Sequence, residues 1–226
     1  MSSASAVNIF PSKLKSITPD RSANIPAIAA KTNGVEILKV EFIKDAISKG
    51  ASIIVSDKKI KYKNHKTPFL LVKDVRKSLS EASSNFYKKK PSNIIAVTGT
   101  NGKSSVANFF YQILKFNKIP AATIGTLGIF SKNYNKKINL TSIDPLSLHK
   151  NLQILAKKKI NNLILEASSH GLEQRRLNNL NINTGIFTNL SHDHLDYHKN
   201  MQSYFSSKMY LFKYLLKKIH FRTEIR

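Results

Sequence analysis

A glycine-rich segment that begins at Val97, VTGTNGKSS, carries the residue types that bind phosphate; we call it the glycine loop. Gly99 and Gly102 permit a tight turn whose backbone N–H groups can face a phosphate, and Lys103 adds a positive charge. Ser104 stands where a hydroxyl can contact Mg²⁺. The spacing is a shortened Walker pattern, G-x-x-G-K-S, because Val97 stands where that pattern has glycine. The alternative is a Gly-Asn turn before an ordinary helix, and the strand–loop–helix context favours phosphate.

Three later segments could also do chemistry. Glu166 ends the apolar run LILE, where a carboxylate is either a metal-binding acid or a strand-end glutamate in solvent. Residues 167–176, ASSHGLEQRR, are polar groups suited to a sugar or phosphate ligand. Residues 191–198, SHDHLDYH, indicate a metal or phosphate site, or else a polar loop whose acids cap a helix. Lys208, within SYFSSKMYLF, is expected by itself to be a surface lysine of a helix.

The elements that must position these groups alternate along the chain. The hydrophobic pattern predicts strands at 93–97, 121–130, 162–167 and 184–190, and helices at 103–116, 145–158 and 201–218. Asp144 and Pro145 mark the start of the middle helix, as N-cap and first-turn residues. This alternation predicts an α/β fold with an open, mainly parallel sheet covered on both faces. Ligands of such sheets bind at the carboxyl ends of the strands.

The earlier part of the chain predicts a separate, smaller α/β domain. Phe42, Ile43, Ala46 and Ile47 have helical spacing, and Gly50 is placed to end that helix. Strands are predicted at 51–56 and 68–72, followed by a helix at 73–87. A lysine run ending in Pro91 then indicates a boundary. We therefore predict two domains, residues 1–90 and 91–226.

Composition narrows the class of protein. The 226 residues carry 37 Lys and Arg against 13 Asp and Glu, a net charge of +24. The excess is almost all lysine and scattered along the sequence, so we interpret it as solvated surface charge and expect no nucleic-acid partner. No apolar run is long enough to span a membrane, and the start does not resemble a secretory signal. The absence of cysteine excludes disulfides and thiolate metal sites, and we expect a cytoplasmic protein.

Four motifs together resemble the Mur ligases: TGTNGKSS, LTSIDP (140–145), LEASSHGLEQRRL (165–177) and FTNLSHDHLDYHKNMQSYFSSKMYLF (187–212). The third and fourth motifs are most similar to the ligases that add the third amino acid to the peptidoglycan precursor UDP-N-acetylmuramoyl-L-alanyl-D-glutamate. The resemblance implies an ATP-dependent amide ligase that joins a diamino acid to this precursor through an acyl phosphate. It also implies an amino-terminal UDP-sugar domain and a central ATP-binding domain.

The resemblance assigns roles to particular residues. ATP binding falls to Gly99, Thr100, Asn101, Gly102, Lys103, Ser104 and Ser105. The catalytic residues are Lys103, Glu166, His194 and Lys208. The Mg²⁺ ligands are Ser104, Glu166, His194 and Lys208, the last carbamylated by CO₂. The UDP-sugar-peptide is expected to contact Thr141, Ser142, Ser168, Gln174 and Arg176.

The sequence also departs from the family. The family's uridine-contacting Asp-Ser-Arg signature appears only as Asp20, Arg21 and Ser22. We expect the carboxyl-terminal ligase domain and part of the central sheet to be missing, so that the chain alone is inactive unless a further segment acts in trans. The alternatives are a nucleotide-binding remnant of a split or degraded ligase, and a ligase of the folylpolyglutamate synthase type.

Overall fold

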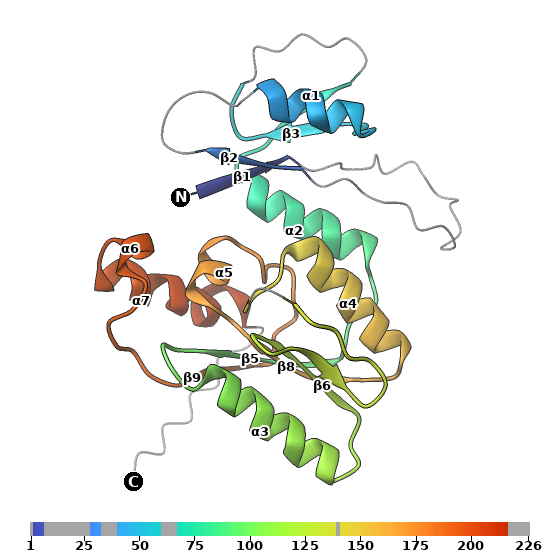
Figure 1. Ribbon diagram of the computed structural model, residues 1–226, viewed down its shortest axis with the longest axis vertical. Helices are drawn as coiled ribbons and strands as arrows, with labels where there is room; N and C mark the ends of the chain where they lie inside the picture. The colour runs from blue at the N-terminus through green and yellow to red at the C-terminus, as the bar shows by residue number, and fades with distance from the viewer. Residues whose placement is uncertain (1, 7–27, 33–39, 60–66, 139–140, 217–226) are drawn as a thin grey trace. The chain divides into compact units, whose positions relative to one another are not determined.

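A computed structural model describes residues 2–6, 28–32, 40–59, 67–138 and 141–216 (Figure 1). The chain divides into two compact units, Met1–Ala82 and Ser83–Arg226, which we describe separately. The candidate uridine signature at residues 20–22 lies outside the described residues. Within the described residues, no helix is both long and apolar enough to cross a membrane.

The first unit contains two small sheets. Its elements are β1 (Ser2–Ala6), β2 (Ile28–Thr32), α1 (Val40–Ser48), β3 (Ile54–Ser56) and β4 (Phe69–Leu71), with α2 (Val75–Phe86) following. β1 and β2 pair antiparallel, whereas β3 and β4 pair parallel. The predicted helix near Ile43 is confirmed: Ile43 and Ala46 on α1 are buried with Ala51 and Ile54 in a small apolar core.

The second unit is built on a five-stranded sheet in the order β7-β6-β8-β5-β9. The strands are β5 (Asn93–Thr98), β6 (Ala121–Gly125), β7 (Gly128–Ser131), β8 (Asn162–Glu166) and β9 (Thr184–Phe187). All neighbouring strands pair parallel except β6 with β7. The prediction of a mainly parallel α/β sheet is therefore confirmed.

Helices cover both faces of this sheet. α3 (Lys103–Phe116) lies on one face, and α4 (Pro145–Lys157) and α5 (Ser169–Glu173) lie on the other, as Figure 1 shows. The central strand β8 is buried from Leu163 to Glu166, because it has neighbours on both sides and helices on both faces. Leu148, Leu152 and Leu155 pack from α4 into the larger core. α6 (Leu195–His198) and α7 (Met201–Tyr210) follow β9.

Two predicted elements were wrong in detail. The run 121–130 is not one strand but the hairpin β6–β7, whose Thr126–Leu127 turn reverses the chain. The helix predicted at 201–218 ends at Tyr210 and continues as one π-helical turn, Leu211–Leu215. The apolar pattern runs through both breaks, so periodicity could not detect them.

His149 is a titratable side chain enclosed in the core of the second unit. It lies on α4 with 0% of its surface exposed, and neither ring nitrogen makes a well-formed hydrogen bond to the described residues. Burial lowers the pKa of His149 to about 4, with the charge of Lys90 adding to the shift and the backbone of Asn178 opposing it. Between about pH 4 and pH 6.5, His149 is therefore neutral in the folded chain and protonated in the unfolded chain.

We expect the stability of the chain to fall as the pH is lowered from about 6.5 to about 4. Because the pKa of His149 is lower in the folded chain than in the unfolded chain, His149 makes the free energy of unfolding about 3 kcal/mol higher above this pH window than below it. Urea unfolding across this pH range should show a flatter pH dependence for His149→Phe than for wild type. The same substitution at exposed His192 serves as control; equal pH slopes for all three proteins would contradict the assignment.

Candidate functional site

The glycine loop lies between the end of β5 and the start of α3, at the carboxyl edge of the sheet. Gly99 has φ 147°, and an added Cβ there would collide with the hydroxyl of Thr188. Gly102 has φ 84° and is the N-cap of α3. No side chain caps the first turn of α3, an arrangement in which the N–H groups of a helix start can bind an anion. Asn189 fixes the loop: its carbonyl accepts the Thr100 N–H at 2.9 Å.

Two lysine ammonium groups meet at the carbonyl oxygen of Gly99. Lys103 Nζ donates to it at 2.9 Å and to the carbonyl of Thr100 at 2.7 Å. Lys208 Nζ, from α7, donates to the same Gly99 oxygen at 2.7 Å. The loop backbone is therefore held between two cations from separate helices.

Lys208 is not the surface lysine that its helical position predicts. Only 1% of it is exposed, and its Nζ lies 4.2 Å from the ring centre of Tyr204. Burial and, next, the charge of Lys103 together lower the pKa of Lys208 to about 8, against the opposing effect of the Asp193 carboxylate. Burial also lowers the pKa of Lys103, against the pull of the carboxylates of Glu166 and Asp193.

Glu166 is buried beside the glycine loop, so the alternative of a strand-end glutamate in solvent was wrong. Its carboxylate accepts the Ser104 hydroxyl at 2.9 Å, and it accepts the N–H and hydroxyl of Thr126 at 3.0 and 3.1 Å. A Cβ on Gly125 would overlap this carboxylate, so glycine leaves room for it. Strand pairing brings Glu166 and the glycine loop together, because Glu166 is opposite Val97 on β5.

His194 borders the same region through aromatic contacts. It begins α6 with φ 52°, and its Nε2 lies 3.5 Å from Asp193 Oδ2. Its ring centre is 4.9 Å from that of His170 and 6.3 Å from that of Tyr204. Tyr204 in turn contacts Thr100 of the glycine loop, with 3.1 Å between their hydroxyl oxygens.

The residues expected to hold the UDP-sugar-peptide form one hydrogen-bonded network. The Ser142 hydroxyl donates to the carbonyl of Glu166 at 3.1 Å and accepts the Ser168 N–H at 3.0 Å. Arg176 donates to the Ser142 carbonyl and to the side-chain oxygen of Gln174, at 2.6 Å in each case. Thr141 joins through its hydroxyl oxygen, which lies 3.0 Å from the hydroxyl oxygen of Thr126.

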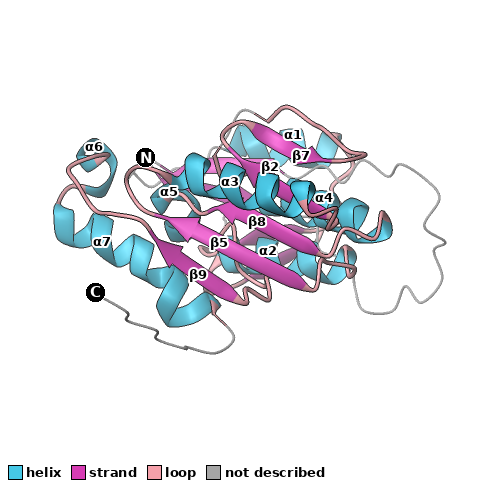
Figure 2. Ribbon diagram, turned by 90° about the horizontal axis from the view of Figure 1, so that it is seen from below, coloured by secondary structure: helices cyan, strands magenta, loops and turns pink. Residues whose placement is uncertain are grey.

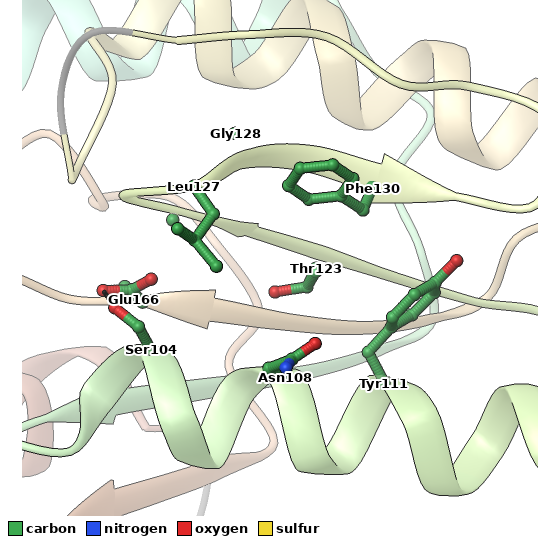
Figure 3. A pocket seen from close by; sticks show the side chains of 9 residues that line it. Ser104, Asn108, Tyr111, Thr123, Leu127, Gly128, Phe130 and Glu166 are labelled. Carbon is green, nitrogen blue, oxygen red and sulfur yellow. Dashed lines mark hydrogen bonds between the residues drawn. The ribbon is translucent and has the colours of Figure 1, made fainter.

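The network therefore connects to Glu166 by two routes. One runs through the Ser142 hydroxyl to the Glu166 carbonyl, and the other through the Thr126 hydroxyl to the Glu166 carboxylate. A cavity of about 160 Å³ also opens beside Ser104 and Glu166, between α3 and the β6–β7 hairpin (Figure 3). Thr123 forms its floor and Leu127 points into it.

Among the described residues, no three His, Cys, Asp or Glu side chains are grouped closely enough to hold a metal ion. Glu166 is beside the glycine loop, whereas the contacts of His194 reach the loop only through Tyr204. A metal site here would need a further ligand of another kind.

Sequence reasoning missed three residues that shape the site: Thr126, Thr188 and Tyr204. Thr126 lies in the turn of the hairpin that was read as one strand. Thr188 donates to the Asn101 carbonyl at 2.6 Å, and Tyr204 is fully buried beneath Lys208. Thr188 falls inside the predicted strand 184–190, whereas β9 ends at Phe187, and only its place near the carboxyl end of that strand, where ligands bind, could have drawn attention to it.

The sequence of this chain is similar to those of known proteins. The family model for the Mur ligase middle domain matches residues 97–221, which run from the glycine loop through α7. The chain belongs to the Mur ligase family.

Two curated Mur ligases show how far the similarity extends. The UDP-N-acetylmuramoyl-L-alanyl-D-glutamate–2,6-diaminopimelate ligase of Brucella melitensis is 41% identical over 207 residues, covering 91% of this chain and 42% of the relative. The ligase of the same name from Rickettsia bellii is 46% identical over 176 residues, covering 76% of this chain and 36% of the relative. The chain thus spans about two fifths of the length of these relatives.

A solved structure of a ligase with that name also matches, with a TM-score of 0.68 and 34% identity. The match covers 78% of this chain and 36% of the solved chain. This chain is therefore similar to the solved ligase in fold as well as in sequence.

We expect the Lys208 amine to titrate near pH 8 in the folded chain, because burial and the charge of Lys103 both disfavour its ammonium form. Replacing the neighbouring cation in Lys103→Met should raise the pKa of Lys208. ¹³C NMR of chain labelled at lysine Cε, with Lys208→Arg to identify the signal, measures both values. A pKa that does not respond to Lys103→Met would contradict the contact between the two cations.

Proposed function

We propose that this chain provides the UDP-sugar-binding and ATP-binding domains, residues 1–90 and 91–226, of a peptidoglycan-synthesis ligase in the cytoplasm. The reaction joins a diamino acid to UDP-N-acetylmuramoyl-L-alanyl-D-glutamate at the expense of ATP. The names of the relatives support this substrate pair, and diaminopimelate is the diamino acid they name. The observation that carries the proposal is the hydrogen-bonded connection from the glycine loop through Glu166 to the Ser142 network.

ATP binding is supported by the geometry of the glycine loop. The loop leads into the N-terminus of α3, where N–H groups can bind a phosphate, and the Lys103 ammonium group is held against the loop carbonyls of Gly99 and Thr100, from which it could turn to a bound phosphate. Two cations close together are unfavourable without an anion, and burial and then the charge of Lys103 lower the pKa of Lys208. A polyphosphate would offset the repulsion between the two cations. The loop takes this shape only with glycine at residue 99, because a Cβ there would collide with the Thr188 hydroxyl.

Mg²⁺ fits the two oxygen donors that the structure brings together, the Ser104 hydroxyl and the Glu166 carboxylate, because it is a hard cation. We propose His194 as a further ligand on the resemblance to the family. Lys208 would supply the missing anionic ligand once its amine has reacted with CO₂. That reaction requires the neutral amine, which a pKa of about 8 makes available near neutral pH. Bound Mg²⁺ would offset the charge repulsion between a carboxylate and a phosphate.

In the proposed reaction, the terminal carboxylate of the UDP-sugar-peptide attacks the γ-phosphorus of ATP, and ADP leaves. The amine of the diamino acid then attacks the acyl carbon of the acyl phosphate, inorganic phosphate leaves, and an amide forms. Thr141, Ser142, Ser168, Gln174 and Arg176 would hold the substrate with its carboxylate toward Glu166 and the glycine loop. Lys103 would stabilise charge on the transferred phosphate.

We expect Lys103→Ala to weaken binding of Mg-ATP by about tenfold or more, because a charge-assisted hydrogen bond to phosphate is lost. Arg176→Ala should weaken binding of UDP-N-acetylmuramoyl-L-alanyl-D-glutamate and leave ATP binding unchanged. Isothermal titration calorimetry of each variant with each ligand measures this. Exposed Lys132→Ala is the control for loss of a positive charge. Equal ATP affinity for Lys103→Ala and Lys132→Ala would refute the phosphate role.

We also expect a carbamate on Lys208. Chain equilibrated with ¹³C-bicarbonate should show one carbamate signal by ¹³C NMR that Lys208→Arg removes and Lys132→Arg retains. The signal should strengthen as the pH rises through about 8, because more of the amine is then neutral. A carbamate signal that persists in Lys208→Arg would contradict the assignment.

A further inference from the structure

The described acidic residues of the second unit are confined to one end of its strands, whereas its basic residues occur at both ends. β5, β8 and β9 point the same way, toward the side where α6 and α7 lie (Figure 2). The acidic residues of its described part all lie at or after strand carboxyl ends or at the start of α4: Asp144, Glu166, Glu173, Asp193 and Asp196. No acidic residue occurs anywhere between residues 82 and 143.

The opposite edge, where the parallel strands begin, is occupied by lysine. We define the lysine rim as seven exposed side chains in the segments that precede β5, β6 and β8: Lys88, Lys89, Lys115, Lys118, Lys157, Lys158 and Lys159. These strand starts are adjacent, since Asn93 is paired with Asn162 and Asn162 with Ala121. Neighbouring strands are about 5 Å apart, so the three starts span about 10 Å. Lysines that are scattered in sequence thus form one cationic edge.

Two of the rim lysines occupy backbone positions where glycine would be less strained, so the fold itself does not require lysine there. Lys118 and Lys159 follow α3 and α4 in the left-handed conformation, each with φ 60°. Glycine occupies such positions after helices with the least strain. Lysines at the two helix ends also complement the helix dipoles, but one cation in each last turn would be enough for that.

Apolar side chains lie within the same edge. Phe116, the last residue of α3, is 90% exposed, and Ile119 in the following turn is 42% exposed. They stand beside Lys115 and Lys118 in sequence. A bilayer with anionic headgroups matches this combination, because lysine is attracted to the surface while a phenylalanine can enter the boundary of the acyl chains.

We propose that the lysine rim and Phe116 form a docking surface for an anionic lipid bilayer, which the chain contacts peripherally. RNA is the competing polyanion. The rim contains no arginine, the residue that dominates base recognition. One exposed phenylalanine among lysines could stack on a base or enter a bilayer, so it does not favour RNA over lipid. The surface lies at the edge opposite the glycine loop, so binding there leaves the carboxyl edge open.

The test uses flotation of the full chain with phosphatidylcholine vesicles, with and without phosphatidylglycerol. Wild type should bind only the anionic vesicles, and added salt should weaken binding. The double variant Lys118→Gly/Lys159→Gly removes two charges at positions whose backbone favours glycine, and we expect affinity to fall about fivefold per lysine. Phe116→Ser should lower affinity about tenfold.

Lys199→Gly is the matched control, because Lys199 is also an exposed left-handed lysine, with φ 66°, but lies at the opposite edge after α6. It should bind vesicles as wild type does. Circular dichroism confirms that each variant is folded. The proposal is overturned if folded wild type does not bind anionic vesicles, or if Lys199→Gly loses as much affinity as the rim variant. It is also overturned if single-stranded RNA binds more tightly than vesicles and Phe116→Ser leaves that binding unchanged.

Discussion

Two lysine side chains share the carbonyl oxygen of Gly99, and the rest of the site is arranged around this contact. Lys103 reaches it from the start of α3, and Lys208 reaches it from α7, more than a hundred residues later in the chain. Two ammonium groups so close together repel each other in a partly buried place, which accounts for part of the lowered pKa of Lys208. Either an anionic ligand or the loss of one positive charge relieves this repulsion. The proposed function uses both, through ATP phosphates and a carbamate.

Glu166 connects this cationic centre to the rest of the carboxyl edge. Its carboxylate is held by Ser104 and Thr126, and its backbone carbonyl accepts from Ser142. A buried carboxylate with several donors is fixed in direction, so the hydroxyls around it are fixed as well. One side chain thereby links the glycine loop to the network of Arg176 and Gln174. In the proposed reaction, this is where the phosphate and the substrate carboxylate would meet.

Much of the fold could be predicted from local pattern. α3 has the predicted bounds, and β5, β8 and α4 lie within a residue or so of their predictions, because each has a clear period and a clear cap or turn signal. The hairpin β6–β7 was missed because the apolar run continues through the Thr126–Leu127 turn. The π-helical turn after Tyr210 was missed because it keeps the apolar spacing of a helix. Local sequence does not record which strand a segment will pair with.

The sequence by itself determined the family and the chemical types at the site, because the glycine loop and the SSHGL and DHLDYH segments are contiguous motifs whose spacing is visible along the chain. Only the tertiary structure decided that Lys208 is buried, that Glu166 is enclosed by Ser104 and Thr126, and that dispersed lysines gather at one edge. Each of these depends on strand order and parallel pairing, which place residues from distant segments side by side. The burial of a charged group follows from everything that packs around it, and most of those neighbours are remote in sequence.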